Sequence, residues 1–242
     1  MNLIIDVGNT NVKLAVFQEG TLLCKKIVKI EDLIINVKKI LKEFQEIEKS
    51  IISSVGKLDE KDVLELEKVT KLTVLSSKTK LPFRNLYKTP KTLGVDRIAL
   101  VCASVHQYSK NNVLIIDAGT CITFDFITEK NNYLGGAISP GIKLRYYALN
   151  NLTANLPLLE KKMPKNIIGK STEDAIHSGV INGVLNEIDG IVQKYGDKYE
   201  DLTVILTGGD ADFLSKRLKS SIFANSNFLL EGLNFILEFN SK

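Results

Sequence analysis

Two short segments of the chain combine an aspartate, a glycine and hydroxyl or amide side chains in an order that suits a phosphate group. They are Asp6-Val7-Gly8-Asn9-Thr10 and Asp117-Ala118-Gly119-Thr120. Glycine permits a turn in which several backbone N–H groups converge on one point, and Asn or Thr adds side-chain donors. Because a carboxylate repels phosphate, each Asp is expected to hold a hydrated cation that bridges to the phosphate. Lys13 follows the first turn and can add positive charge there.

The alternative interpretation is that both segments are ordinary hairpin turns, which Asp, Gly and Asn favour for backbone reasons alone. For a single copy this alternative is the better one. Two copies in matching places favour a shared chemical role, because a turn does not require Asp two residues before Gly each time.

Gly94-Val95-Asp96-Arg97 stands between the two hairpins and precedes a helix-like segment at 98–106. Two interpretations are open. Asp96 either places its charge at the N-terminus of that helix, with Arg97 as a solvated surface residue, or it takes a proton from a substrate hydroxyl. In the second case Arg97 is a fork-shaped partner for a substrate carboxylate.

Other candidate residues give weaker signals. Thr207-Gly208-Gly209 ends a strand, and its glycines allow a nucleotide base or ribose to lie against the backbone, although a strand-to-helix turn uses Gly anyway. His106 and His177 lie in expected helices without Cys or carboxylate partners nearby, so we interpret both as packing or surface residues.

The elements that position these residues are expected to be duplicated. Apolar runs and alternation predict strands at 3–5, 12–16, 22–28 and 51–54, the last ending at Gly56, with a surface helix at 31–46. The same order restarts 111 residues later at 113–116, followed by strands at 122–126, 133–138 and 204–206 and a helix at 171–195. An internal duplication explains the repeat. We therefore expect an α/β protein with two mixed-sheet domains, 1–110 and 111–242, facing each other across a cleft.

Composition narrows the functional classes. The net charge of the 242 residues is +4, with 32 basic and 28 acidic residues interleaved along the chain, which argues against nucleic acid as a partner. The three cysteines lack disulfide or zinc-site spacing. Neither a signal-peptide core nor an apolar run of membrane-spanning length is present, so we expect a cytoplasmic protein without a membrane role.

Taken together and in order, these motifs resemble the type III pantothenate kinases. The matching segments are Asp6 to Lys13, Tyr87, Gly94 to Arg97, Asp117 to Thr120, Gly169 to Gly179 and Thr207 to Gly209. Hairpins of the Asp-x-Gly-Thr type are shared by the wider superfamily of sugar kinases, actin and heat-shock ATPases, whereas Gly-x-Asp-Arg is more specific. The resemblance implies two ribonuclease H-like domains with five-stranded sheets. It also implies transfer of phosphate from ATP to the primary hydroxyl of pantothenate, giving 4'-phosphopantothenate in the first step of coenzyme A synthesis.

The resemblance also implies roles for individual residues. ATP phosphates are assigned to Asp6, Val7, Gly8, Asn9, Thr10, Asn11, Val12, Lys13 and Thr120. Asp96 matches the proton acceptor, and the pantothenate pocket matches Tyr87, Gly94, Val95, Asp96, Arg97 and Thr172. Asp117 matches the ligand of a monovalent cation, K⁺ or NH₄⁺, which the family needs alongside Mg²⁺. Thr172 matches a residue that reaches substrate from the partner subunit, which implies a homodimer with shared active sites.

Rival interpretations make different demands on the sequence. A nuclease on a ribonuclease H scaffold needs three or four carboxylates around two metals and a basic groove. A non-catalytic ATP-binding accessory protein can lose Asp96, which is present here. Another small-molecule kinase of the same superfamily is the closest alternative, and only the stretch from Tyr87 to Arg97 speaks against it.

Overall fold

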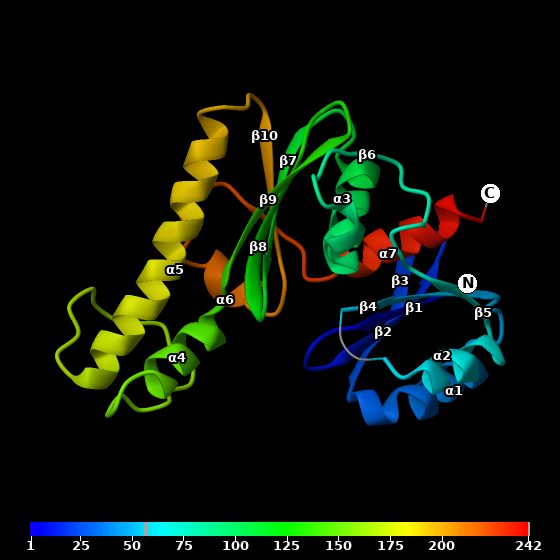
Figure 1. Cartoon of the computed structure of the whole chain (residues 1–242), viewed down its shortest axis with the longest axis horizontal. Helices are drawn as coiled ribbons and strands as arrows, with labels where there is room; N and C mark the ends of the chain where they lie inside the picture. The colour runs from blue at the N-terminus through cyan, green and yellow to red at the C-terminus, as the bar shows by residue number, and fades with distance from the viewer. Residues whose placement is uncertain (56–57, 242) are drawn as a thin grey trace. The chain divides into compact units, whose positions relative to one another are not determined.

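The computed structural model describes residues 1–55 and 58–241, arranged in two compact units (Figure 1). The first unit comprises Met1–Ser109, Asn131–Tyr133 and Asn227–Lys242, and the second comprises Lys110–Lys130 and Leu134–Ser226. The first change of unit falls beside the domain boundary expected at 110. The last segment of the chain, expected in the second domain, belongs to the first unit.

A mixed five-stranded sheet forms the centre of the first unit. Its strands are β1 (Asn2–Val7), β2 (Val12–Gln18), β3 (Thr21–Val28), β4 (Lys49–Ser54) and β5 (Lys71–Val74), in the order β3-β2-β1-β4-β5. β1 pairs antiparallel with β2 and parallel with β4, and the predicted strands are confirmed. Gly56 lies outside the described residues. The helices are α1 (Leu33–Glu43), α2 (Glu60–Glu67), α3 (Val95–Gln107) and α7 (Phe228–Phe239).

β1 carries a continuous apolar run from Leu3 to Ile5 because both of its faces are covered. Leu3 and Ile5 pack in one cluster with residues of α1 and α2, while α7 contacts β1 and β4. Strands buried on both faces read as continuous apolar runs rather than as alternating ones. Asp6, one residue before the end of this strand, is therefore carried into a buried position.

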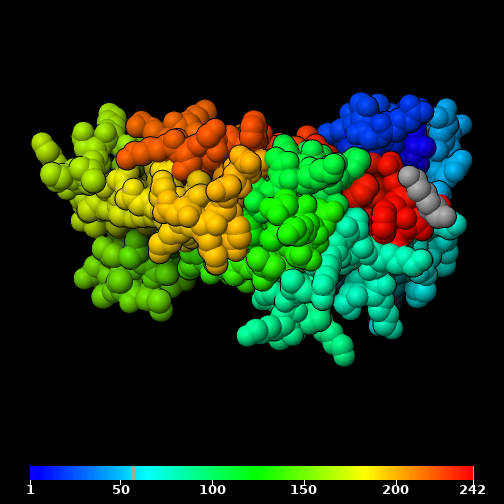
Figure 2. All heavy atoms as spheres, turned by 90° about the horizontal axis from the view of Figure 1, so that it is seen from above, coloured from blue at the N-terminus to red at the C-terminus, as the bar shows by residue number. Residues whose placement is uncertain are grey.

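α7 packs closely against α3, and a glycine sets the distance between them. A Cβ on Gly232 would lie 2.0 Å from the carbonyl oxygen of Ala99, so this position has no room for a side chain. At the start of the central strand β1, the Asn2 amide donates to the Asn234 Oδ1 at 2.9 Å. Figure 2 shows the red atoms of the C-terminal segment beside the blue atoms of the N-terminal strands.

The second unit repeats this strand arrangement, as the internal duplication predicts. Its strands are β7 (Asn112–Ala118), β8 (Cys121–Ile127), β9 (Asn132–Pro140), β10 (Leu202–Thr207) and β11 (Phe223–Ala224), in the order β11-β10-β7-β8-β9. The short strand β6 (Arg84–Asn85) pairs with β9 as a sixth strand, where five were expected. β7 pairs antiparallel with β8 and parallel with β10. The first two residues of β9 belong to the first unit, where Asn132 and Tyr133 pair with β6.

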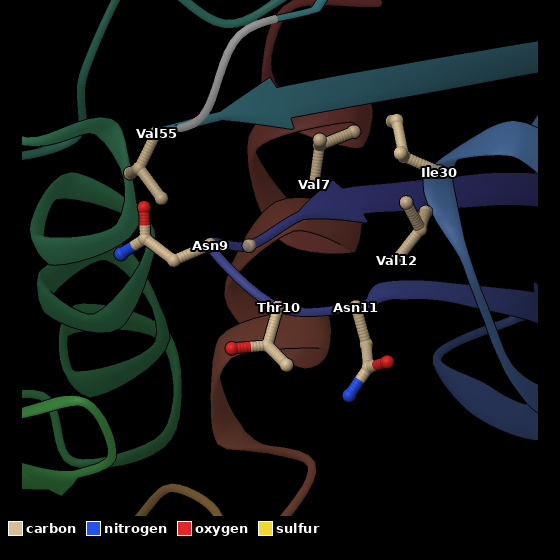
Figure 3. Close-up of a pocket in the computed structure, with 8 residues that line it drawn as sticks. Val7, Asn9, Thr10, Asn11, Val12, Ile30 and Val55 are labelled. Atoms are coloured by element: carbon tan, nitrogen blue, oxygen red, sulfur yellow. The ribbon is translucent and has the colours of Figure 1, made fainter.

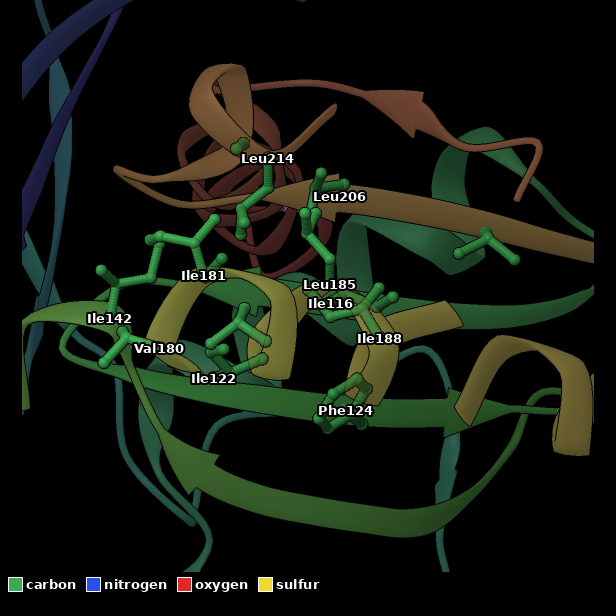
Figure 4. Packing of buried hydrophobic residues seen from close by; sticks show 14 of the residues in the cluster. Ile116, Ile122, Phe124, Ile142, Val180, Ile181, Leu185, Ile188, Leu206 and Leu214 are labelled. Carbon is green, nitrogen blue, oxygen red and sulfur yellow. The ribbon is translucent and has the colours of Figure 1, made fainter. Parts of the chain in front are cut away.

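The helices of the second unit are α4 (Ile142–Asn151), α5 (Thr172–Gly196) and α6 (Ala211–Ser215). The long helix α5, predicted at 171–195, packs its apolar stripe against the sheet of its own unit (Figure 4). Val184 and Ile188 are fully buried there among residues of β7, β8 and β10. The apolar side chains of α5 are thus buried within their own unit. Gly179 lies on an exposed part of the helix with open space around it.

Among the described residues, no helix is both long enough and apolar enough to cross a membrane.

Candidate active site

The first hairpin forms a tight turn between β1 and β2. The Gly8 N–H donates to the Asn11 carbonyl at 3.1 Å, which closes the turn. A pocket of about 400 Å³ opens at this turn, lined by Val7, Gly8, Asn9, Thr10, Asn11, Val12, Ile30 and Val55. Figure 3 shows the polar side chains of Asn9, Thr10 and Asn11 projecting from the turn. Hairpin backbone and polar side chains meet here, as the phosphate hypothesis requires.

Asp6 lies at the base of this hairpin and is only 5% exposed. Lys13, directly opposite it in β2, places its Nζ 3.3 Å from Asp6 Oδ2. Burial raises the pKa of the Asp6 carboxyl above its ordinary value, and the charge of Lys13 offsets part of that rise. Ser53, the partner of Asp6 in β4, acts in the same direction as Lys13. The buried Asp6 carboxylate is therefore stabilised by a cation beside it, and Lys13 provides that positive charge in this structure.

Asp96 is held close enough to Asp6 for the two carboxylates to interact. The negative charge of Asp96 further raises the pKa of Asp6. Asp96 lies in the first turn of α3, half-buried, and its Oδ1 accepts a hydrogen bond from the Arg97 backbone N–H at 2.8 Å. The structure thus brings together the first hairpin and the Gly-x-Asp-Arg motif, which are far apart in the sequence.

Arg97 is not a solvated surface residue. It is 6% exposed, its guanidinium donates to the Tyr133 hydroxyl at 2.9 Å, and its Cζ lies 5.5 Å from the centre of the Tyr87 ring. The Tyr87 and Tyr133 rings are 6.1 Å apart. The structure therefore places two of the predicted pocket residues together, and it adds Tyr133, a fully buried residue that no sequence motif marked.

The second hairpin is equally tight, with the Gly119 N–H donating to the Cys121 carbonyl at 2.9 Å. Asp117 stands opposite Thr207 in β10, and Gly208 follows with a positive φ of 95°. A Cβ on Gly208 would lie 2.4 Å from Asp117 Oδ1. Glycine is required at position 208 because a side chain there would collide with the Asp117 carboxylate. A side chain on Gly209 would meet no other atom, so space for a ligand is open there.

Thr172 begins α5 and is exposed. It lines an apolar pocket of about 860 Å³ between α4 and α5, together with Arg145, Ala148, Leu149, Leu152, Thr153, Leu156, Ala175, Ile176, Gly179 and Val180. No residue of the second hairpin lines this pocket. Leu152, which lines this pocket, is 82% exposed.

The residues available for a metal ion are few. No group of three or more His, Cys, Asp or Glu side chains that can hold a metal occurs in the part of the chain that the structure describes. Mg²⁺ in phosphoryl-transfer sites is bound by one or two carboxylates, waters and substrate phosphates, and does not need an all-protein cage. Isolated carboxylates such as Asp6 fit a metal that arrives with ATP.

The fold is that of the actin-like ATPases and sugar kinases. A ROK family glucokinase from Streptomyces griseus, solved with glucose and AMPPNP, superposes with a TM-score of 0.53 at 13% identity, over 99% of each chain. A Campylobacter jejuni protein described as a Baf family transcriptional activator superposes with a TM-score of 0.64 at 22% identity, over 99% of this chain and 98% of that one.

Sequence comparison is more specific. The model of the type III pantothenate kinase family matches residues 2–194. A relative from Christiangramia forsetii, named type III pantothenate kinase, is 55% identical over 99% of both chains. The chain belongs to the type III pantothenate kinase family.

Proposed function

We propose that this chain transfers the terminal phosphoryl group of ATP to the primary hydroxyl of pantothenate, giving 4'-phosphopantothenate in the first step of coenzyme A synthesis. The observation that carries the proposal is the electrostatic interaction between Asp6 of the first hairpin and Asp96 of Gly-x-Asp-Arg. It unites a phosphate-binding turn with a carboxylate that can accept a proton. Membership of the family supplies the substrate.

ATP is bound by the first hairpin in this proposal. The terminal phosphates lie against the residues from Asp6 to Lys13, and Thr120 of the second hairpin supplies a further hydroxyl donor. Mg²⁺ bound with ATP neutralises phosphate charge during transfer. Lys13 is then in position to exchange its contact with Asp6 for one with phosphate, since its side chain is 35% exposed.

Asp96 takes the proton from the attacking hydroxyl of pantothenate. Gly94 and Val95 precede it, and Arg97 with Tyr87 forms the adjacent part of the pantothenate pocket. The Tyr133 hydroxyl holds the Arg97 guanidinium in a fixed place. A buried guanidinium is a strong partner for a carboxylate or a hydroxyl acceptor, which pantothenate provides.

Asp117 is proposed as the ligand of a monovalent cation, K⁺ or NH₄⁺. Its carboxylate lies at the end of β7 beside the backbone of Gly208, next to the second hairpin turn. A carboxylate facing phosphate needs a cation between the two groups.

The active protein is proposed to be a homodimer in which Thr172 contacts the pantothenate held by the partner subunit. Support comes from the apolar pocket beside Thr172, from the exposed Leu152, and from the family resemblance. We also propose a cytoplasmic location, where ATP is available to the reaction.

The activity is tested by incubating the purified chain with ATP, Mg²⁺, K⁺ and pantothenate, and measuring ADP release together with the mass of the product. Glucose and N-acetylmannosamine serve as competing acceptors, because sugar kinases share the fold. We expect ADP release that depends on pantothenate and a product heavier by one phosphate. Phosphorylation of a sugar with none of pantothenate would replace the proposal by the sugar-kinase alternative.

A further inference from the structure

A second polar pocket lies in the second unit, and no residue of either hairpin lines it. Its volume is about 250 Å³, and it is lined by Lys162, Met163, Pro164, Lys165, Asn166, Ile168, Lys170, Asp174 and His177. Three lysines face one aspartate, so the lining carries a net positive charge. None of these lysines forms a salt bridge within the described residues.

One of the residues that line the pocket is a buried histidine in contact with a tyrosine hydroxyl. His177 is 7% exposed, and its Nδ1 lies 2.7 Å from the Tyr146 hydroxyl. The backbone of Lys162 interacts with the same hydroxyl. In the tautomer that accepts the Tyr146 proton at Nδ1, the ring N–H is on Nε2, the nitrogen left for a ligand.

The loop that carries the lysines is fastened to α5. The Ser178 hydroxyl donates to the Ile167 carbonyl, and a Cβ on Gly169 would lie 2.3 Å from the Ala175 backbone nitrogen. Together with the link between Tyr146 and Lys162, these contacts hold the loop from 162 to 170 against the start of α5. The pocket is therefore formed before any ligand binds, which reduces the entropy cost of binding.

From this arrangement we propose that the pocket binds the phosphate group of a small phosphorylated molecule or free phosphate, through His177 Nε2 and the lysines at 162, 165 and 170. Ammonium groups act as point charges toward phosphate oxygens, and a neutral imidazole N–H donates a directed hydrogen bond. Asp174 restricts the anion to the lysine side of the pocket. None of the residues that line this pocket is among those assigned above to ATP, to pantothenate or to the monovalent cation.

The chain has only two histidines, which makes a direct test available. Protein labelled with ¹⁵N in its histidine rings is titrated with inorganic phosphate against chloride at constant ionic strength, at about pH 8, where phosphate is a dianion. We expect the Nε2 signal of His177 to shift in a saturable manner. His106, stacked on Phe235 in the first unit at 4.3 Å, is the internal reference and should not move.

Two variants decide whether the pocket is responsible. Lys165→Met combined with Lys170→Met should weaken phosphate binding at His177 about tenfold or more, because two charge-assisted contacts are lost. Lys194→Met, an exposed lysine in the last turn of the same helix, should leave binding unchanged. All three substituted lysines are exposed, and thermal unfolding checks that each variant folds.

Three outcomes would overturn the proposal: no shift of His177 with either inorganic phosphate or glycerol 3-phosphate, equal binding by the double variant and the Lys194→Met control, or an equal response to acetate. A parallel titration with glycerol 3-phosphate separates the two sources of the ligand. Binding of both anions identifies the phosphate group itself as the ligand, and binding of the ester alone identifies a phosphorylated molecule.

Discussion

The carboxylate of Asp96 occupies the space that any side chain on Gly94 would need. A Cβ at Gly94 would stand 2.4 Å from Asp96 Oδ1. The lack of a side chain at Gly94 thus leaves room for the orientation that the carboxylate of Asp96, the proposed base, adopts. Gly94 does not stabilise the helix through a cap, since α3 begins at Val95 without a side-chain hydrogen bond from position 94.

Gly94→Ala is therefore expected to lower kcat about tenfold or more by turning the Asp96 carboxylate away from its position. The side chain of Asp96 can rotate, so the melting temperature should change little. Steady-state kinetics and thermal unfolding measure the two effects. Gly190→Ala is the matched control, since it adds a Cβ to open space on α5, and it should leave kcat unchanged.

Asp96→Asn keeps the side-chain volume and removes the proton acceptor. We expect the fold to be retained and turnover to fall by about 10² or more. Steady-state ADP release with saturating pantothenate measures the loss. Turnover near that of the unmodified chain would remove Asp96 from the mechanism.

Asp6→Asn should separate activity from stability. Because burial raises the pKa of Asp6 above 3.8, this carboxyl contributes stability that is present below that value and lost as the pH rises through the folded-state pKa. The uncharged Asn should thus make the protein more resistant to unfolding at neutral pH, with little difference at about pH 3.

Activity should fall by about 10² or more, since the negative charge that attracts a cation to the phosphate-binding turn is lost. Denaturant unfolding at both pH values is the measurement, and a variant less stable than the unmodified chain at neutral pH would contradict the argument.

The monovalent cation is tested by replacing K⁺ with Na⁺ in the assay. We expect activity to depend on K⁺ or NH₄⁺, and Asp117→Ala to lose most activity together with that dependence. Full activity in a buffer containing only Na⁺ would rule out the proposed role of Asp117.

The shared active site is tested by mixing subunits. Asp96→Asn and Thr172→Tyr should each be inactive alone, whereas heterodimers contain one site with intact Asp96 from one chain and intact Thr172 from the other. Mixing under conditions that exchange subunits should restore activity. If both variants remain dimeric by light scattering and mixing restores nothing, the sites are not shared.

Periodicity and turn residues predicted most of the fold, because each half opens with the same strand, hairpin and strand. β1, β2, β7 and β8 lie where apolar runs and alternation indicated. The position of α7 was not predictable in this way. Its packing on α3 depends on the close approach of Gly232 to Ala99. These residues are distant in sequence, and neither residue type indicates which segment it will pack against.

Site residues were predictable where a sequence motif determines the local backbone conformation, as in the two hairpins and in the segment from Gly94 to Arg97. Tyr133 was missed because its role depends on the distance to Arg97, and a tyrosine in a strand has no local signature. His177 was interpreted as a packing residue because its partner Tyr146 lies 31 residues away, on another helix.

The return of α7 to the first unit affects how the chain folds as it is synthesised. The contacts from Asn2 to Asn234 and from Ala99 to Gly232 join α7 to β1 and α3, which are both translated before the second unit. Residues 134–226 are complete before that happens and have their own core. The second unit can therefore fold while the chain is being synthesised, whereas the first, although its synthesis starts earlier, is completed only when α7 has left the ribosome.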